Sequence, residues 1–427
     1  MFRSARLRRL SKEGFWVVLG QAMAVLGSLV GVRLLTELLD PVEYGELALG
    51  MTVAMLVNQT VLGPLGNGIT RFYAPAVEQG DLGSYLNAAR RLVWSTTGIM
   101  VLIILFAVTA FLIVGRTEWL AITTAAFIFA ILSGYCSVLS GIQNAARQRS
   151  IVALHQGLES WARFLFAAAL MVWLGPSSTV AMLGYTMGAM LVLGSQYLFF
   201  RKVIPRHATP ADKEQKWREQ IWKYSWPMAV TGVLSWGFFA SQRWALELFA
   251  STEDVGYFSA VFQIGFTPFS LAGGILMSLM MPIIFSRAGD GGDKQRVRLV
   301  SKPIIKFCLV ASLMVLVATA IGARFHDIVF RLLVAEQYRG VSHFLPFAIL
   351  AAGMFQVSLF LSMVILASTE TRVLLPLNTI GNLLIVAINL LFTYLLGMEG
   401  LFIAMVMGSV MHFIWNIFNV WKVSRNV

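Results

Sequence analysis

The fold is decided by the stretch Arg33-Leu-Leu-Thr-Glu-Leu-Leu-Asp-Pro-Val-Glu-Tyr-Gly45. It separates an apolar run that ends at Leu39 from a second run that begins near its last glycine. A related stretch, Arg243-Trp-Ala-Leu-Glu-Leu-Phe-Ala-Ser-Thr-Glu-Asp-Val-Gly256, recurs later in the chain. The offset is 210 residues at the arginines and 211 at the closing glycines, close to half of the 427 residues. Because charges are costly in apolar helices, this recurrence indicates two similar halves that begin with the same hairpin.

The composition is that of a membrane protein. Charged residues make up 13% of the chain, about half of their share in an average soluble protein. Several apolar runs exceed the ~20 residues that a helix needs to cross the hydrocarbon core of a bilayer. Backbone groups without hydrogen bonds are costly in lipid, so such runs must be helical. We therefore expect an all-α polytopic membrane protein.

The distribution of basic residues predicts the topology. We predict twelve transmembrane helices, at about 15–39, 45–70, 92–114, 121–143, 151–174, 179–200, 224–249, 255–285, 303–323, 345–367, 373–396 and 400–421. With both termini in the cytoplasm, 26 of the 33 lysines and arginines fall on the inner side, four outside and three within spans. This bias follows the positive-inside rule, and it explains the net charge of +12 without a nucleic-acid partner.

A polar inner segment at the midpoint predicts the domain organisation. Residues 1–205 form an N-terminal lobe with six spans, residues 206–223 a cytoplasmic linker, and residues 224–427 a C-terminal lobe with the other six. Six is an even number, so both lobes enter the membrane in the same direction. The pseudo-two-fold axis between them is therefore predicted to run along the membrane normal.

The basic N-terminus, the pair Gly20-Gln21 and the stretch from Arg33 to Gly45 resemble the opening of bacterial polysaccharide flippases. These Wzx-type proteins belong to the superfamily that also holds the MATE drug exporters and the lipid II flippases. Span number, length, midpoint segment and repeat agree with the resemblance along the whole chain. The lipid II flippases usually add two further spans, which this chain does not contain.

The resemblance implies a MATE-like fold, in which two six-helix lobes surround a cavity that opens alternately to each side of the membrane. It implies a flippase of polysaccharide or lipopolysaccharide biosynthesis in the bacterial inner membrane, often coupled to an ion gradient. The cargo would be a polyprenyl-pyrophosphate-linked oligosaccharide. The expected partners are this cargo, the membrane lipids and glycan polymerase or assembly proteins. We expect a monomer without a cofactor.

Arginines within the spans are the candidates for binding the cargo phosphate. These substrate-binding candidates are Arg33, Arg163 and Arg243. A planar guanidinium suits them to this role because it can bond two phosphate oxygens at once. Arg163 lies near the middle of its span, beyond easy reach of a headgroup, so it needs an intramembrane partner or a water-filled cavity. The other two lie near outer ends of spans, where snorkelling to the headgroups is the alternative.

Each of these arginines has a glutamate four residues away on the same helical face. The ion-coupling candidates are therefore Glu37, Glu159 and Glu247. Two interpretations stay open for each pair. A structural ion pair would lower the cost of burying both charges. Alternatively, cargo phosphate would claim the arginine, and the carboxylate would then take up a proton more readily. His155 stands one turn before Glu159 and is interpreted as interfacial.

Two other functions fit parts of the sequence. The layout allows a MATE-like exporter of small cationic compounds. A membrane enzyme such as a glycan polymerase or ligase would need an outer catalytic cluster, for which only these residues are available: Arg324, His326, Asp327, Arg331, Glu336 and Arg339. The sequence contains no Gly-rich phosphate loop followed by Lys and Ser or Thr, and no spacing typical of a metal site. We therefore expect a transporter rather than an enzyme, with no metal.

Overall fold

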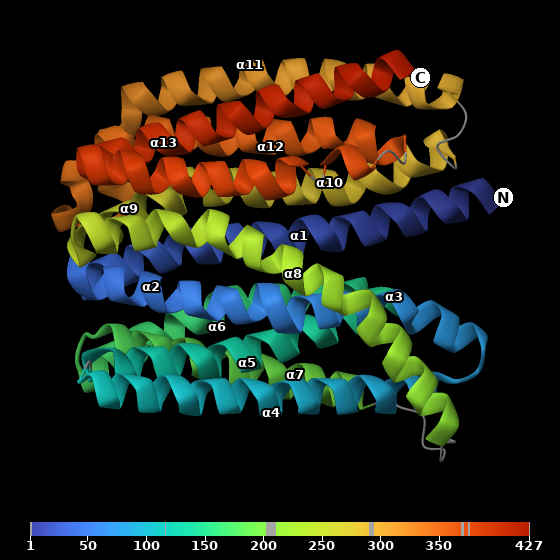
Figure 1. Ribbon diagram of the computed structural model, residues 1–427, viewed down its shortest axis with the longest axis horizontal. Coiled ribbons are helices and arrows are strands. Elements are labelled where there is room, and N and C mark those ends of the chain that lie inside the picture. The colour runs from blue at the N-terminus through green and yellow to red at the C-terminus, as the bar shows by residue number, and fades with distance from the viewer. Residues whose placement is uncertain are drawn as a thin grey trace. The chain divides into compact units, whose positions relative to one another are not determined.

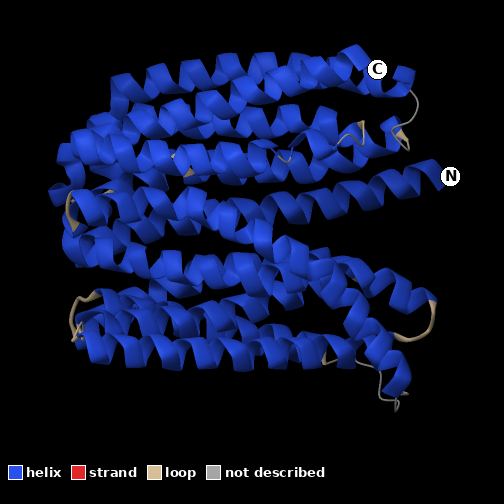
Figure 2. Ribbon diagram, viewed as in Figure 1, coloured by secondary structure: helices blue, strands red, loops and turns tan. Residues whose placement is uncertain are grey.

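The computed structural model describes residues 2–115, 117–201, 211–289, 294–368, 371–374 and 376–426. Helices make up nearly all of this part of the chain, and it contains no strand (Figure 2). The predicted all-α fold is confirmed. The first part of the predicted linker, residues 206–210, lies outside the described residues.

The helices follow one another with short connections, as Figure 1 shows. The first half of the chain contains α1 (Phe2–Leu38), α2 (Pro41–Val57), the π-turn η1 (Asn58–Leu62), α3 (Gly63–Glu78), α4 (Leu82–Val114), α5 (Glu118–Ala145), α6 (Arg149–Leu174) and α7 (Ser178–Phe200). The second half contains α8 (Ala211–Phe249), α9 (Thr252–Gly265), α10 (Thr267–Ala288), α11 (Lys294–Leu333), η2 (Glu336–Phe344), α12 (Leu345–Ala367), η3 (Thr371–Leu374), η4 (Leu377–Gly381) and α13 (Asn382–Asn426).

Many of these helices have the length and composition of membrane spans. Within the described residues, ten helical segments are long and apolar enough to cross a bilayer. Helix α8 is not among the ten, and α13 counts as one although its backbone breaks at Gly397, where φ is 59° and ψ is −138°. Many apolar helices of this kind make the chain a multi-pass membrane protein.

The chain divides into two compact units. The first contains Met1–Gly27 and Glu46–Trp236, and the second contains Ser28–Gly45 and Gly237–Val427. Helices α1 and α8 therefore each begin in the first unit and end in the second. These limits differ from the predicted lobe limits at residues 205 and 223, so that division of the two halves stays a prediction.

The start of α8 belongs to the core of the first unit. Trp217 and Ile221 are buried there with Ile69 of α3 and Tyr85 of α4. The Trp217 and Tyr85 rings meet edge to face, 6.0 Å apart. The described part of the predicted linker is thus a packed amphipathic helix, because burying these two apolar side chains fixes its orientation.

The two repeat stretches fold into the same helix–turn–helix. In the first copy, Oδ1 of Asp40 accepts a hydrogen bond from the backbone N–H of Glu43 at 2.9 Å, at the start of α2. In the second copy, Oγ of Ser251 accepts one from the backbone N–H of Asp254 at 3.1 Å, at the start of α9. Both acceptors satisfy an N–H that the first helical turn leaves unpaired. Their 211-residue offset equals that of the closing glycines.

Within the second unit, the first turns of α2 and α9 cross at these two glycines. A Cβ at Gly45 would collide with the carbonyl oxygen of Thr252, and a Cβ at Gly256 would collide with that of Pro41. Pro41 and Thr252 are themselves equivalent positions of the repeat. The two contacts are therefore reciprocal, and close backbone packing explains why glycine recurs in both copies.

Candidate functional site

Arg163 lies in the middle of α6, where this helix packs against α7. The two helices approach each other closely at Gly188. A Cβ built on this glycine would lie only 2.8 Å from the backbone of Arg163. The Arg163 guanidinium lies over two aromatic rings, 4.5 Å from the Phe164 centroid and 5.7 Å from the Tyr185 centroid. Its Nε has no hydrogen-bond partner. Cation–π contacts thus hold the charge in place and leave a hydrogen-bond donor unused.

Glu159 lies one turn before Arg163 and is half-buried. Among the described residues, no ion pair joins the two side chains. The structural ion pair, one of the two interpretations left open above, is absent here, and the guanidinium lies over the aromatic rings instead. Glu159 is thus a half-buried carboxylate that has no salt-bridge partner in the described part of the chain.

His155, one turn further back on α6, is tied to its surroundings. Its Nδ1 lies 2.8 Å from the carbonyl oxygen of Ile151, and its Nε2 lies 3.1 Å from Oγ of Ser195 in α7. Both ring nitrogens are thus engaged. The side chain is buried rather than interfacial, and it fastens α6 to α7.

Arg33 lies in the second unit, where the end of α1 is fastened to the segment after α11. The guanidinium forms an ion pair with Glu37 and donates a hydrogen bond to the carbonyl oxygen of Val334. Gln337 donates to the carbonyl oxygen of Leu39 at 2.9 Å, and the hydroxyl of Tyr338 donates to the same oxygen at 3.0 Å. These donors satisfy carbonyls that a helix end leaves unpaired. The ion pair between Arg33 and Glu37, one of the two interpretations left open above, is present.

Arg243, the repeat equivalent of Arg33, has different surroundings in the same unit. Its guanidinium lies 5.0 Å from the ring centroid of Phe262 and 5.7 Å from that of Phe258. Its Nε has no hydrogen-bond partner. Glu247 instead accepts a hydrogen bond from Oγ1 of Thr252 at 2.9 Å. The predicted ion pair between Arg243 and Glu247 is absent from the described structure, because each side chain has found another neighbour.

Arg163 and Arg243 therefore share an arrangement that Arg33 lacks. Each guanidinium lies over two aromatic rings, and each keeps an Nε donor without a partner. Buried donors normally find partners, so these two Nε atoms are exceptions to the usual pairing. The two residues belong to different compact units.

Comparison with known proteins shows the family and the fold. A family model described as "Polysaccharide biosynthesis protein" matches residues 10–288. The chain belongs to this family. No curated protein sequence matches it. The predicted resemblance to the superfamily of MATE exporters and lipid II flippases is confirmed by the family match together with the solved structures that share its fold.

The similar structures are transporters and flippases. An inward-facing multidrug resistance MATE family transporter of the MOP superfamily has a TM-score of 0.72 at 14% identity, covering 95% of this chain and 96% of that one. An outward-facing transporter of the same description has a TM-score of 0.59 at 16% identity, covering 97% of each chain. The lipid II flippase MurJ, inward closed, has a TM-score of 0.64 at 13% identity, covering 96% of this chain and 88% of that one. At such identities these likenesses establish the fold.

The structure of this family member also contains a buried polar network that the sequence analysis did not identify. Oγ of Ser358 in α12 lies 2.7 Å from Nδ1 of His412 in α13 and accepts a hydrogen bond from Nδ2 of Asn416 at 2.8 Å. All three side chains are buried. The signal was available, because the histidine and asparagine are four residues apart in an apolar run. Ionisable residues inside a membrane helix are candidates for function.

The outer residues considered for an enzyme form a structural contact instead. Oγ of Ser342 donates a hydrogen bond to Oδ1 of Asp327 at 3.0 Å and lies 3.0 Å from Nδ1 of His326. These hydrogen bonds tie η2 to the end of α11.

Proposed function

We propose that the chain is a flippase that moves a polyprenyl-pyrophosphate-linked oligosaccharide across the bacterial inner membrane by alternating access. The observation that carries this proposal is Arg163. Its guanidinium is held by aromatic rings in the middle of an apolar helix, with a donor left over. In a polysaccharide biosynthesis protein, a phosphate group of the cargo is the anion that suits such a fork. The flipped product would pass to glycan polymerase or assembly proteins.

The other candidate residues take different roles in this proposal. Arg243 is a second cation for the cargo, because it too keeps a free Nε donor. Arg33 is structural, because Glu37 and a backbone carbonyl already engage it. Glu247 is engaged by a threonine hydroxyl. Glu159 is then the carboxylate for ion coupling.

Depletion of the protein tests the function. Lipid-linked oligosaccharide should accumulate on the cytoplasmic face, measured by mass spectrometry of extracted lipids and by protection of the glycan from a glycosidase added outside. Normal glycan lipids and normal surface polysaccharide, in cells without a redundant transporter, would contradict the proposal. Faster efflux of cationic dyes by vesicles containing the protein, with unchanged glycan lipids, would favour the cation exporter instead.

The proposed topology has twelve crossings and two cytoplasmic termini. The ten candidate spans become twelve if α8 crosses with residues 224–249 and α13 crosses twice, turning at Gly397. A cysteine introduced as Met398→Cys should then react with an impermeant maleimide from outside the cell. The control variant Lys422→Cys should react only after permeabilisation. The native Cys136 and Cys308 are buried and should contribute little labelling. Outside labelling at position 422 would contradict this topology.

Replacing Glu159 should separate transport from the ion gradient. The change Glu159→Gln removes the ionisable group without breaking an ion pair, so the melting temperature should stay close to that of the wild type. Flipping in reconstituted vesicles should lose its response to an imposed pH gradient. The exposed carboxylate at Glu336 provides the matched control, because Glu336→Gln should leave that response intact. An unchanged response in the Glu159 variant would assign coupling to another group.

A further inference from the structure

The first unit has an apolar groove that is not lined by any of the candidate arginines discussed above. It has a volume of about 780 Å³ and lies between helices α3, α4, α5 and α7. Apolar side chains dominate its lining, among them Ile69, Val93, Leu139 and Leu193. This size is in the range of ~300–1,000 Å³ that small-molecule sites have. Helix α4 contributes Leu86, Val93 and Trp94 to the lining, and the Trp94 side chain is exposed.

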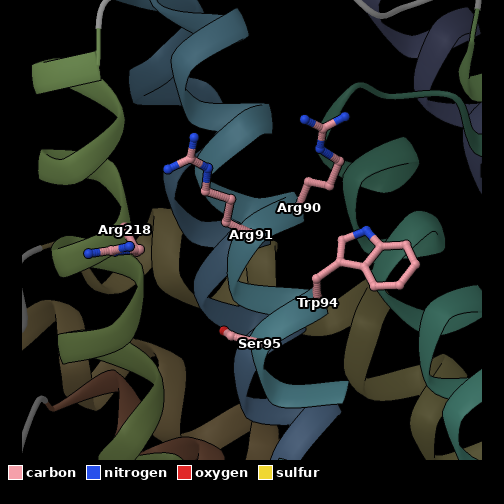
Figure 3. Close-up of a pocket in the computed structure, with 5 residues that line it drawn as sticks. All are labelled: Arg90, Arg91, Trp94, Ser95 and Arg218. Atoms are coloured by element: carbon pink, nitrogen blue, oxygen red, sulfur yellow. The ribbon is translucent and has the colours of Figure 1, made fainter. Parts of the chain in front are cut away.

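A cationic pocket adjoins this groove. It has a volume of about 510 Å³ and is lined by Arg90, Arg91, Trp94, Ser95 and Arg218. Figure 3 shows the two neighbouring arginines on α4, with Trp94 and Ser95 one turn further along, and Arg218 opposite on α8. Arg90 and Trp94 line both the pocket and the groove. The two spaces therefore meet at these side chains.

The arginines of this pocket are only partly neutralised. Nε of Arg91 forms an ion pair with Glu214 of α8 at 2.8 Å. A second ion pair, from Lys213 to Asp81 at 2.5 Å, fastens the same turn of α8 near the start of α4. In the described part of the chain, neither Arg90 nor Arg218 has an ion-pair partner. Two cations are thus held beside an apolar groove without a counter-charge from the protein.

We propose that this groove and pocket together bind an anionic phospholipid of the bilayer. The phosphodiester lies in the pocket that Arg90 and Arg218 both line, and one acyl chain follows the groove between α4, α5 and α7. Trp94 is 68% exposed, and its amphipathic ring suits the level of the headgroups. Basic pockets between membrane helices are the recurring kind of site for anionic headgroups. A free phosphate ion would leave the apolar groove unused.

The exposed Trp94 at the junction of groove and pocket favours a bilayer lipid over a rare carrier lipid, because abundant phospholipids have constant access to an exposed site. The bound phosphate would bridge α4 and the first part of α8. It would add a contact to the two ion pairs that already fasten this part of α8. This site is independent of the proposed cargo and of Arg163, so either proposal can fail without the other.

Native mass spectrometry of the full-length protein tests the site. The probes are phosphatidylglycerol and phosphatidylcholine with the same acyl chains, a polyprenyl diphosphate, and inorganic phosphate as a competitor. We expect retained phosphatidylglycerol and little phosphatidylcholine. Each arginine near the phosphate contributes roughly fivefold to binding, so the double change Arg90→Gln with Arg218→Gln should weaken it roughly 30-fold. The matched control is Lys302→Gln with Lys306→Gln, which removes two exposed charges from α11.

A second variant tests the acyl chain separately. Gly194 of α7 lines the groove, and a Cβ built there meets no atom within 4 Å. The change Gly194→Phe should therefore fill the groove without disturbing the helices, and phosphatidylglycerol retention should fall at an unchanged melting temperature. Gly98→Phe is its control, because Gly98 also has open space around it and does not line the groove.

Four results would overturn the assignment. Equal retention of phosphatidylcholine would mean that the arginines do not select charge. Retention by Gly194→Phe at the wild-type level would remove the acyl chain from the groove. Tighter binding of the polyprenyl diphosphate than of phosphatidylglycerol would make this a carrier site. Displacement of the phospholipid by inorganic phosphate at similar concentrations would show a site for phosphate alone.

Discussion

Replacing Arg163 by alanine should lower the rate of flipping by at least about 100-fold while the protein stays folded. The guanidinium can give the cargo phosphate two charge-assisted hydrogen bonds, and each such bond is worth about 1.5–3 kcal/mol. Arg163→Lys should recover little of this loss, because an ammonium keeps the charge but has no planar fork. The measurement is the initial rate of flipping in vesicles, together with the melting temperature of each purified variant.

The structure sharpens the test against a purely structural role. Because Arg163 and Glu159 do not form an ion pair, the double change Glu159→Ala with Arg163→Ala should not restore transport. Arg331→Ala is the control, since that exposed side chain lies outside the candidate site. Restored transport in the double variant would mean that Glu159 and Arg163 serve only to neutralise each other's charge. The cargo assignment would then be wrong.

Adding a single methyl group at Gly45 or Gly256 should destabilise the protein. An alanine Cβ at either position collides with a backbone carbonyl of the facing hairpin, and backbone cannot move aside as a flexible side chain can. Overpacking of this kind typically costs about 1–3 kcal/mol. Larger side chains, as in Gly256→Leu, should prevent recovery of folded protein. Thermal unfolding of the detergent-purified variants measures the effect.

The control substitutions for this prediction should leave the melting temperature unchanged or raise it. A helical glycine with open space should tolerate alanine, which is about 1 kcal/mol better than glycine in a helix interior. Gly98→Ala and Gly274→Ala have such space and should melt at or above the wild-type temperature. Because Gly45 and Gly256 belong to one crossing, the double variant should be less destabilised than the sum of the two single variants. Additive losses, or a Gly45→Ala variant as stable as the wild type, would contradict the reciprocal contact.

The repeat shows where sequence reasoning succeeds and where it stops. The sequence predicted that Arg33 pairs with Glu37, and it does, because the i, i+4 spacing suffices when no other partner competes. The same spacing failed for Arg243. There, two aromatic rings of α9 take the guanidinium, and a threonine at the start of that helix takes Glu247. Local spacing sets which groups can meet, and the side chains of the adjoining helix decide which do.

The polar network of His412 gives the same lesson. Its helical spacing with Asn416 was visible, but the partner that makes it a network, Ser358, lies on another helix. The lipid groove is a further case. Arg90, Arg91 and Arg218 at its rim are among the basic residues predicted to lie on the cytoplasmic side. Their position beside a cavity depends on how α4 packs against α5 and α7, and on where Trp217 anchors α8.

The sequence by itself determined the all-helical class, the membrane location and the family. Long apolar runs must be helical in lipid. The charged hairpin recurs after about half of the chain, which indicates the two-fold repeat. Only the tertiary structure decided that the two closing glycines lie in one reciprocal crossing, and that Arg163 and Arg243 keep unused donors. The physical reason is that the backbone hydrogen bonds of a helix form between residues close in sequence, and an apolar run in lipid must form them. The partners of a buried charge are instead set by how side chains pack within and between neighbouring helices.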